Sequence, residues 1–451
     1  MRMKQTDVVD VAIIGGGLSG LAAAVSLAVK GVRVALFERS PKLGGRCYSY
    51  IDEKTGDVVD NGQHVLLGAY HNTIRYLDLI GSRKFLRERP SLSLPLHHPE
   101  KGFGTFNVVS LPRPFHLTAG MLKFKLLSFN DRKKLLNVGF ALRGWNMELE
   151  RKLSSLSIEQ WLNELHQSEG AKQCVWYPLA ISVMNELPQT ASALLFARSL
   201  KLAFLGKKSD SAVLIPGVGQ TALYVDGAVR LLEKHKAMIH TSTEIDSLII
   251  QHSRAGGIKT TSGDTIAAKH VISAVPYFAL ENLIPSEYRT MKSFTGLNQF
   301  ASSPIVSIHL WFDKEFMEQE YVGLIGKTLQ WVFDRRKIMN EEGKPHSYIT
   351  AVISGAYETV GLSKDALVET ALKDLHLVFP KSKTATLLHS IVIKEKRASF
   401  SPTNEVESFR PSSETEIQNL YLAGDWTNTG LPATIEGAIM SGFMAAKLSS
   451  R

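Results

Sequence analysis

The spacing of apolar and polar positions changes sharply close to the N-terminus of this chain. An apolar, β-branched run at 11–14 leads into glycines at 15–20, and small apolar residues then fill 21–29. A second apolar run ends in Glu38. This order predicts a buried strand, a tight turn, a helix and a second strand, which together form a βαβ unit.

Two later stretches repeat this alternation of strand and helix. Residues 213–276 predict a strand, a helix over 222–236, one strand over 238–250 and a buried strand over 269–276. Residues 420–448 predict a short buried strand and a closing helix. We expect the three stretches to join in one discontinuous α/β domain, made of residues 1–84, 206–289 and 396–451.

The intervening residues, 85–205 and 290–395, lack this rhythm and predict a second, α+β domain. The stretch that begins at Ser157 is a capping box, Ser-Ile-Glu-Gln, which opens a helix. Strand patterns follow at 304–312 and 346–354. We expect this second domain to bind the substrate.

Composition adds limits on compartment and metal content. The 451 residues, 44% hydrophobic and 21% charged, are ordinary for a globular protein with more than one core. Cys47 and Cys174 have no metal or redox spacing, which favours a reducing, cytoplasmic compartment. The pair His97-His98 predicts a polar loop, and no metal site is expected.

The formal net charge of +9 suits nucleic acid, an anionic membrane or an acidic substrate. No stretch resembles a nucleic-acid module, so peripheral contact with the inner face of a membrane is the better expectation. Residues 111–134 mix apolar and basic positions as an interfacial segment does. A core-facing helix with a solvated basic face explains the same pattern. The apolar run at 11–37 is explained by its strand and helix, so we expect no transmembrane helix.

The glycines of the first unit have the spacing of a dinucleotide-binding fingerprint. Gly15 permits the turn, Gly17 allows a pyrophosphate to approach the backbone, and Gly20 lets the helix pack on the strand. Free N–H groups at the helix N-terminus attract phosphate, and Glu38 can accept hydrogen bonds from a ribose diol. No second such unit exists in the sequence, so the reductant must come from outside.

Two further blocks indicate FAD. Gly44-Gly45-Arg46 lets the backbone pass close to a bulky group and adds a cation that can reach a phosphate. Gly424-Asp425 ends a short strand, and Pro432 is expected to start a helix whose N-terminus carries partial positive charge. Together these blocks resemble the FAD motifs of the amine oxidase and carotenoid desaturase superfamily.

A closer resemblance lies in the stretches DNGQHVLLGAY at 60–70 and TGLPATIEGA at 429–438. Both are similar to signatures of the hydroxysqualene dehydroxylases, also called squalene-associated FAD-dependent desaturases. The resemblance implies an α/β fold with a Rossmann-like FAD-binding domain of the glutathione-reductase/amine-oxidase type and a discontinuous α+β substrate domain. It also implies FAD-dependent reduction of hydroxysqualene, a C30 isoprenoid lipid, to squalene for hopanoid biosynthesis, with an external electron donor.

The resemblance also implies which residues contact FAD. These are Gly15, Gly17, Leu18, Ser19, Gly20, Glu38, Arg39, Gly44, Gly45, Arg46, Gly62, Gln63, His64, Ile245, Gly424, Asp425, Thr434 and Ile435. His64 is the candidate acid or hydroxyl-orienting group, although it could simply bond backbone or flavin. Tyr70 and Asp60 are weaker catalytic candidates, Asp60 being the better cap of its turn. Glu436 is expected to complement its helix dipole.

Other functions are compatible with the superfamily motifs. A carotenoid-type polyene desaturase transfers hydride in the opposite direction, from substrate to oxidised flavin. An amine oxidase is a further alternative, but no aromatic-cage signature precedes the C-terminal helix. A non-enzymatic flavoprotein or lipid carrier would require a dead site. The stretch at 60–70 favours the dehydroxylase.

Overall fold

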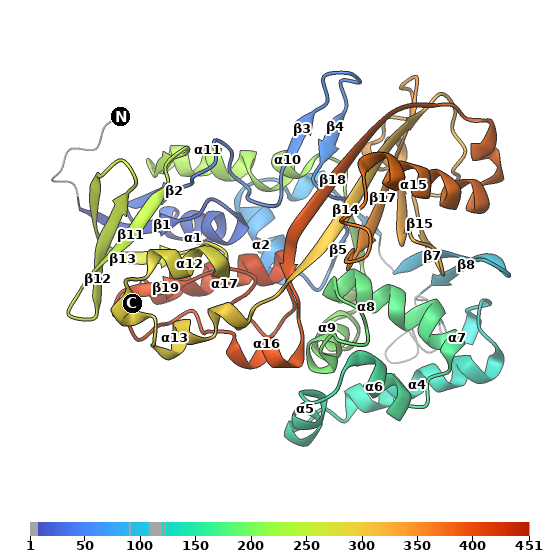
Figure 1. Ribbon diagram of the computed structural model, residues 1–451, viewed down its shortest axis with the longest axis horizontal. Coiled ribbons are helices and arrows are strands. Elements are labelled where there is room, and N and C mark those ends of the chain that lie inside the picture. The colour runs from blue at the N-terminus through green and yellow to red at the C-terminus, as the bar shows by residue number, and fades with distance from the viewer. Residues whose placement is uncertain (1–7, 90–91, 108–119, 121, 451) are drawn as a thin grey trace.

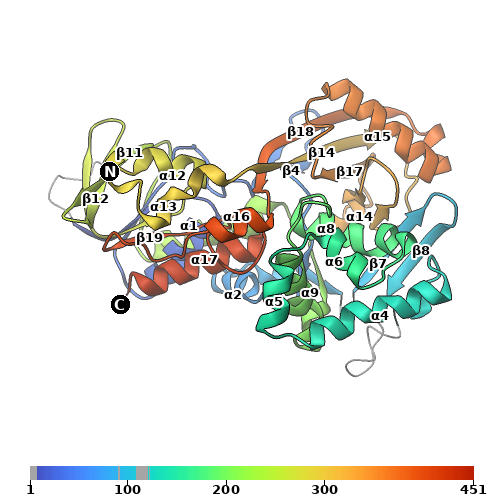
Figure 2. The same ribbon diagram turned by 60° about the horizontal axis from the view of Figure 1, so that its bottom comes forward.

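The computed structural model describes residues 8–89, 92–107, 120 and 122–450, and it contains two large sheets and a layer of helices (Figures 1 and 2). The first sheet has seven strands, of which β12 and β11 form an antiparallel extension of a parallel core. In spatial order they are β10 (Met238–His240), β2 (Val34–Phe37), β1 (Val9–Ile14), β13 (Thr265–Ser273), β12 (Arg254–Thr260) and β11 (Ile245–Gln251), with β19 (Leu420–Leu422) beside β13.

Helices α1 (Leu18–Ala28) and α17 (Ile435–Leu448) pack directly on each other beside this sheet (Figure 1). A Cβ atom at Gly442 would lie 2.1 Å from the Ser19 carbonyl oxygen, so only glycine allows this approach. One at Gly20 would lie 1.9 Å from the Gly15 carbonyl oxygen. Helices α2 (His71–Leu79), α10 (Gln220–Tyr224) and α11 (Asp226–Lys234) share an apolar core with α1 and α17.

The second sheet is built around two long antiparallel strands, β14 and β18, that extend from the first part of the molecule (Figure 2). Its spatial order is β18 (Leu387–Phe400), β14 (Ser302–Phe312), β17 (Ser347–Ser354), β16 (Trp331–Asp334), β15 (Tyr321–Leu324), β7 (Ser93–His98) and β8 (Gly102–Asn107). Helix α15 (Lys364–Val378) shares an apolar core with β14 and β17.

A separate helical core packs on the β7–β8 and β15–β16 end of that sheet. Its helices are α4 (Phe129–Arg143), α5 (Met147–Leu153), α6 (Ile158–Glu164), α7 (Glu169–Ala171), α8 (Tyr177–Met184) and α9 (Ala193–Leu205), with a π-helical turn at Lys172–Trp176. The predicted capping box is confirmed, because the Ser157 hydroxyl accepts from the Gln160 N–H while the Gln160 side chain accepts from the Ser157 N–H.

The remaining elements connect these parts. The strands are β3 (Ser49–Ile51), β4 (Val58–Asp60), β5 (Leu66–Leu67), β6 (Leu86–Arg89) and β9 (Val213–Pro216). The helices are α12 (Tyr277–Leu283), α13 (Lys292–Thr295), α14 (Arg335–Met339) and α16 (Asn404–Phe409). Strands β3 and β4 form a hairpin around Thr55-Gly56, a pair that predicts a turn from the sequence.

Several local predictions were wrong. The single strand predicted over 238–250 is two strands, β10 and β11, because the chain turns at Ser242, where φ is +51°. His97 and His98 belong to β7 and not to a loop, since the alternating apolar side chains Leu94 and Leu96 face the helical core. Pro432 does not start the last helix, whose N-cap is Thr434.

The predicted interfacial segment lies partly outside the described residues, which omit 111–119 and 121. Within the described part, Phe124, Leu126 and Leu127 are buried in the helical core. These three apolar side chains therefore face inward, as the core-facing alternative requires. Among the described residues, no helix is long and apolar enough to cross a membrane.

The close contact of α1 with α17 generates a prediction. Gly442→Ala should lower the free energy of unfolding by about 1–3 kcal/mol, because the added methyl group must displace the Ser19 backbone. Gly139→Ala, inside α4 where a Cβ meets nothing within 4 Å, should instead raise it by about 0.5–1 kcal/mol. Thermal unfolding of both variants checks the opposite signs. Equal shifts would contradict the contact.

Candidate active site

The loop between β1 and α1 has the shape that a pyrophosphate needs. Gly15 has a φ of +104°, a backbone conformation that residues with a side chain rarely adopt. A Cβ atom there would also lie 2.7 Å from the Ala274 carbonyl oxygen. Gly17 is different, since its Cβ would meet only the Gly45 Cα, at 4.0 Å. The first-turn N–H groups, beginning with Leu18 and Ser19, have no partner within their own helix. Open space for a phosphate group and unpaired helix N–H donors therefore occur together at Gly17.

Glu38 lies at the end of β2, beside this loop. Its two carboxylate oxygens accept hydrogen bonds from the Gly16 N–H (2.7 Å) and the Ser40 N–H (2.8 Å), and each retains a free lone pair for a further donor. The Thr243 N–H bonds the Glu38 carbonyl, which places Ile245, at the start of β11, in the same region. Arg39 is exposed.

The glycine pair at 44–45 runs alongside the first loop. Gly44 and Gly45 have φ of +103° and +60°, and the Gly44 N–H bonds the Gly16 carbonyl at 2.8 Å. Arg46 follows and donates to both carboxylate oxygens of Asp425, each at 2.8 Å. Burial lowers the pKa of Arg46, but the charge and hydrogen bonds of Asp425, with smaller contributions from other acidic groups, together outweigh it and raise the pKa overall. Arg46 and Asp425, both predicted to contact FAD and drawn from opposite ends of the chain, are therefore paired with each other.

The N-terminus of α17 is capped by Thr434, whose hydroxyl accepts from the Gly437 N–H, and Ile435 is its first residue. Glu436 lies in the first turn of α17, where its charge complements the helix dipole as expected. It is 2% exposed, and its carboxylate also accepts from the backbone N–H groups of Asn72 and Thr73, so it caps α2 as well. This bond fixes the α17 N-terminus beside the chain that leads into α2.

That chain is the segment Asp60–Tyr70, and it connects the two halves of the site. The Asn61 side chain donates to the Arg46 carbonyl at 2.8 Å. Asp60, 3% exposed, accepts from the Gln220 N–H (2.9 Å) and from Arg335 Nη2 (2.7 Å). Asp60 therefore forms an ion pair with Arg335 of α14 and caps α10. The sequence predicts instead that it caps its own turn.

Gln63 and His64 lie next to this ion pair. Arg335 Nη1 donates to Gln63 Oε1, and Gln220 Nε2 lies 2.7 Å from His64 Nδ1. Burial lowers the pKa of His64, although the charge of Asp60 and the Gly62 carbonyl, which favours a protonated ring, oppose it. Burial also raises the pKa of Tyr70 to about 12, so both side chains are uncharged at neutral pH.

A second buried ion pair lies three residues upstream. Arg336 donates to both oxygens of Asp57, each at 2.7 Å, and Trp311 Nε1 donates at 2.8 Å. Burial raises the pKa of Asp57, but the Arg336, Lys344 and Trp311 hydrogen bonds outweigh it and lower the pKa overall. Adjacent arginines of α14 thus bind the β3–β4 hairpin twice.

These residues fit a bound dinucleotide cofactor. The space at Gly17, the open N–H groups of α1 and the Glu38 carboxylate suit a pyrophosphate and a ribose. Two buried acceptors near the Asp60 segment, Asn61 Oδ1 and Gln220 Oε1, have no partner among the described residues. Nowhere among the residues that the structure describes do three or more His, Cys, Asp or Glu side chains come together as they would to hold a metal ion.

A family model for flavin-containing amine oxidoreductases matches residues 18–448. The chain belongs to this family. Three curated relatives named hydroxysqualene dehydroxylase are 27–28% identical, that of Sinorhizobium fredii over 446 residues and 98% of both chains. The 15-cis-phytoene desaturase of Synechococcus elongatus is 24% identical over 97% of this chain and 95% of its own.

Solved structures share the fold. An oxidoreductase from Methanosarcina mazei has a TM-score of 0.76 at 18% identity, covering 97% of this chain and 100% of its own. A putrescine oxidase variant has a TM-score of 0.72 at 18% identity, covering 98% and 99%. The predicted fold class and the FAD cofactor of this flavin-containing amine oxidoreductase are therefore confirmed, as is the resemblance drawn from its motifs.

Sequence reasoning missed two residues of the polar cluster, Gln220 and Arg335. Gln220 follows the turn at Gly217–Gly219, which signalled a change of direction but no role for the next side chain. Arg335 follows a strand in the second sheet and carries no motif. The sequence leaves open whether Trp161, Trp176, Phe196 and Phe204 line a lipid tunnel or pack between helices. In the structure the first three are buried in the helical core, and Phe204 packs against it.

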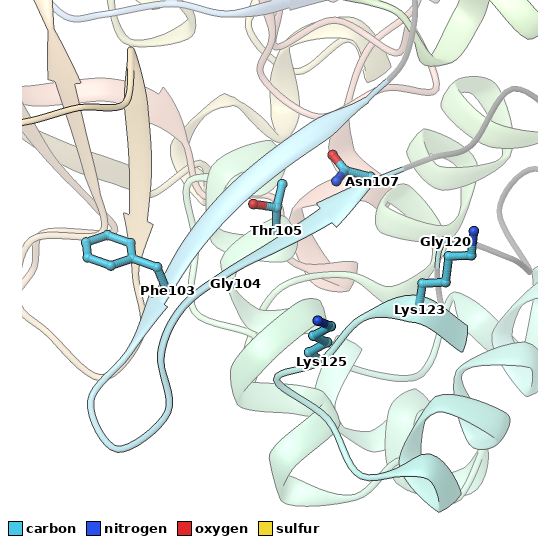
Figure 3. Close-up of a pocket in the computed structure, with 7 residues that line it drawn as sticks. All are labelled: Phe103, Gly104, Thr105, Asn107, Gly120, Lys123 and Lys125. Carbon is cyan, nitrogen blue, oxygen red and sulfur yellow. The ribbon is translucent and has the colours of Figure 1, made fainter.

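A pocket of about 450 Å³ lies elsewhere, between β8 and the chain at 120–125 (Figure 3). Its lining residues are Phe103, Gly104, Thr105, Asn107, Gly120, Lys123 and Lys125. None of them belongs to the cluster around Asp60. The pocket is therefore not part of the candidate active site.

The open space at Gly17 generates a prediction. Gly17→Leu should abolish FAD retention while the apoprotein still folds, because its side chain enters the space for the pyrophosphate and meets little protein. Flavin absorbance per protein after desalting, with the melting temperature of the apoprotein, measures both effects. Gly256→Leu, at an exposed glycine of β12, should retain FAD. Full flavin content in Gly17→Leu would refute the assignment.

Proposed function

We propose that this flavoenzyme catalyses reductive dehydroxylation of hydroxysqualene to squalene. The observation that carries the proposal is the match over nearly the whole chain to three hydroxysqualene dehydroxylases. In such a reaction the carbon–oxygen bond breaks, a hydride replaces the hydroxyl group, and the oxygen leaves as water. Reduced FAD, when bound, would supply both that hydride and the proton that the leaving oxygen takes up, since FADH2 loses both when it is oxidised to FAD.

The chain's own residues contribute orientation and exclusion of water. A hydroxyl leaving group needs a hydrogen-bond donor, and His64 is the side chain of the Asp60–Tyr70 segment that we assign to this role. Its uncharged neighbours and the buried Asp60–Arg335 pair add no net charge beside it.

Electrons must arrive from an external donor, because the sequence contains one dinucleotide fingerprint and the FAD assignment uses it. The reductant therefore meets the flavin transiently or is carried by a partner.

Anaerobic incubation of the dithionite-reduced enzyme with hydroxysqualene tests the reaction. We expect squalene and oxidised flavin in equal amounts, and His64→Ala with FAD bound should lower the rate on the order of 100-fold. The oxidised enzyme incubated with phytoene is the parallel assay. Desaturated product there, with no squalene in the first assay, would replace our proposal with the polyene desaturase.

We further propose that the outer face of α4 contacts an anionic bilayer, the source of such a lipid. Phe129 and Phe140 lie on one face of this helix and are 63% and 66% exposed. The helix carries four basic residues, Arg132, Lys133, Lys134 and Arg143, against the single acid Asp131. Exposed aromatic rings among cations complement anionic headgroups.

Flotation with vesicles containing phosphatidylglycerol checks this contact. We expect the wild type to float at low salt and the double variant Phe129→Ser/Phe140→Ser to lose most of its bound fraction. The control, Leu377→Ser/Leu388→Ser, removes two other exposed apolar side chains, 56% and 41% exposed, and should float normally. If the wild type stays in solution, the bilayer contact is wrong.

A further inference from the structure

The hydrogen bonds around His64 determine which of its ring nitrogens carries the proton. Gln220 Nε2 bonds both the Gly62 carbonyl and His64 Nδ1, the latter at 2.7 Å. A carbonyl oxygen can only accept, so the amide group that faces Gly62 must be the NH2. The same NH2 then donates to Nδ1. His64 Nδ1 therefore lacks a hydrogen, and the neutral ring carries its hydrogen on Nε2.

Gln220 itself is held rigidly. It is 4% exposed, and its backbone N–H donates to Asp60 Oδ1 at 2.9 Å. Asp60 is in turn paired with Arg335, which is 2% exposed, at 2.7 Å. Because all three residues are buried and Asp60 is ion-paired with Arg335, the Gln220 amide has little freedom to rotate or withdraw.

A parallel set of bonds fixes the backbone of His64. The guanidinium of Arg335 can only donate, so the Gln63 atom that it meets is Oε1. Gln63 Nε2 consequently faces the His64 carbonyl, at 3.1 Å. The imidazole is thus held both at its Nδ1 and through its own backbone, while its Nε2 has no hydrogen-bond partner among the described residues.

Asp60 is the charged group that acts on this ring, and Arg335 pairs with it. Burial of the ring lowers the pKa of His64 and favours the neutral form at pH 7. A neutral imidazole is a good hydrogen-bond donor through Nε2 and a very weak acid.

We propose that Gln220 is a positioning residue that holds His64 in the Nε2–H tautomer, so that the ring donates a hydrogen bond to the substrate hydroxyl group without giving up a proton. This role rests on the proposed dehydroxylation, but the tautomer does not. Gln220 acts only through His64, and the Asp60–Arg335 pair keeps Gln220 in place.

The variant Gln220→Glu tests the proposal, because a carboxylate accepts from Nδ1–H where the amide donated. Side-chain nitrogen NMR of the FAD-loaded, ¹⁵N-histidine-labelled protein should show an unprotonated Nδ1 at His64 in the wild type, assigned by its absence in His64→Asn. In Gln220→Glu, Nδ1 should become protonated. The turnover rate, kcat, with hydroxysqualene should fall on the order of 100-fold with KM little changed.

Gln330→Glu is the matched control. The Gln330 amide bonds only the backbone of Ser354, at 2.9 and 2.7 Å, so the variant should leave the His64 signals and kcat unchanged. Gln220→Met removes the donor without adding a charge and should give a mixture of tautomers. A wild-type ring protonated at Nδ1, or an unchanged His64 signal in Gln220→Glu, would overturn the tautomer assignment.

The NMR measurement uses no substrate and thus separates this proposal from the proposed function. If hydroxysqualene is not converted but the tautomer switches as expected, the dehydroxylation is wrong and the Gln220–His64 relation stands. If the tautomer switches and kcat is unchanged, the positioning role is refuted.

Discussion

The close approach of α1 and α17 is the constraint on which the site depends. Each helix follows a strand of the same parallel sheet, and Gly442 allows the two backbones to touch. Their contact places the residues that precede them, Gly15–Gly20 and Gly424–Asp425, at one edge of the sheet. Arg46 can then bond Asp425 across 379 positions of sequence. Without that packing, the two ends of the chain would contribute to no common site.

Buried carboxylates also fix the site, because they need hydrogen-bond donors that carboxylates at the surface find in water. Asp57, Asp60 and Glu436 are all buried, and each satisfies its oxygens with donors from distant elements. A buried carboxylate without such partners would carry a large desolvation penalty. The segment at 57–73 is therefore tied to α14, α10 and α17, and its side chains have well-defined positions between the two sheets.

The sequence allowed confident prediction of features that depend on neighbouring residues. The glycine fingerprint, the capping box at Ser157 and the β3–β4 hairpin depend on local backbone conformation, and the structure shows all three. The partners of Asp60 and Glu436 are set by tertiary packing, since Arg335 is 275 positions from Asp60 and Thr73 is 363 from Glu436. Spacing along the chain carries no trace of such pairs, so Gln220 and Arg335 were missed.

The two adjacent arginines of α14 have a mechanical consequence. Separating either buried pair would cost on the order of 3–5 kcal/mol, and a hinge between the sheets would have to separate both while bending β14 and β18. Thermal motion therefore breaks both ion pairs at the same time only rarely. The two sheets consequently keep nearly constant positions relative to each other.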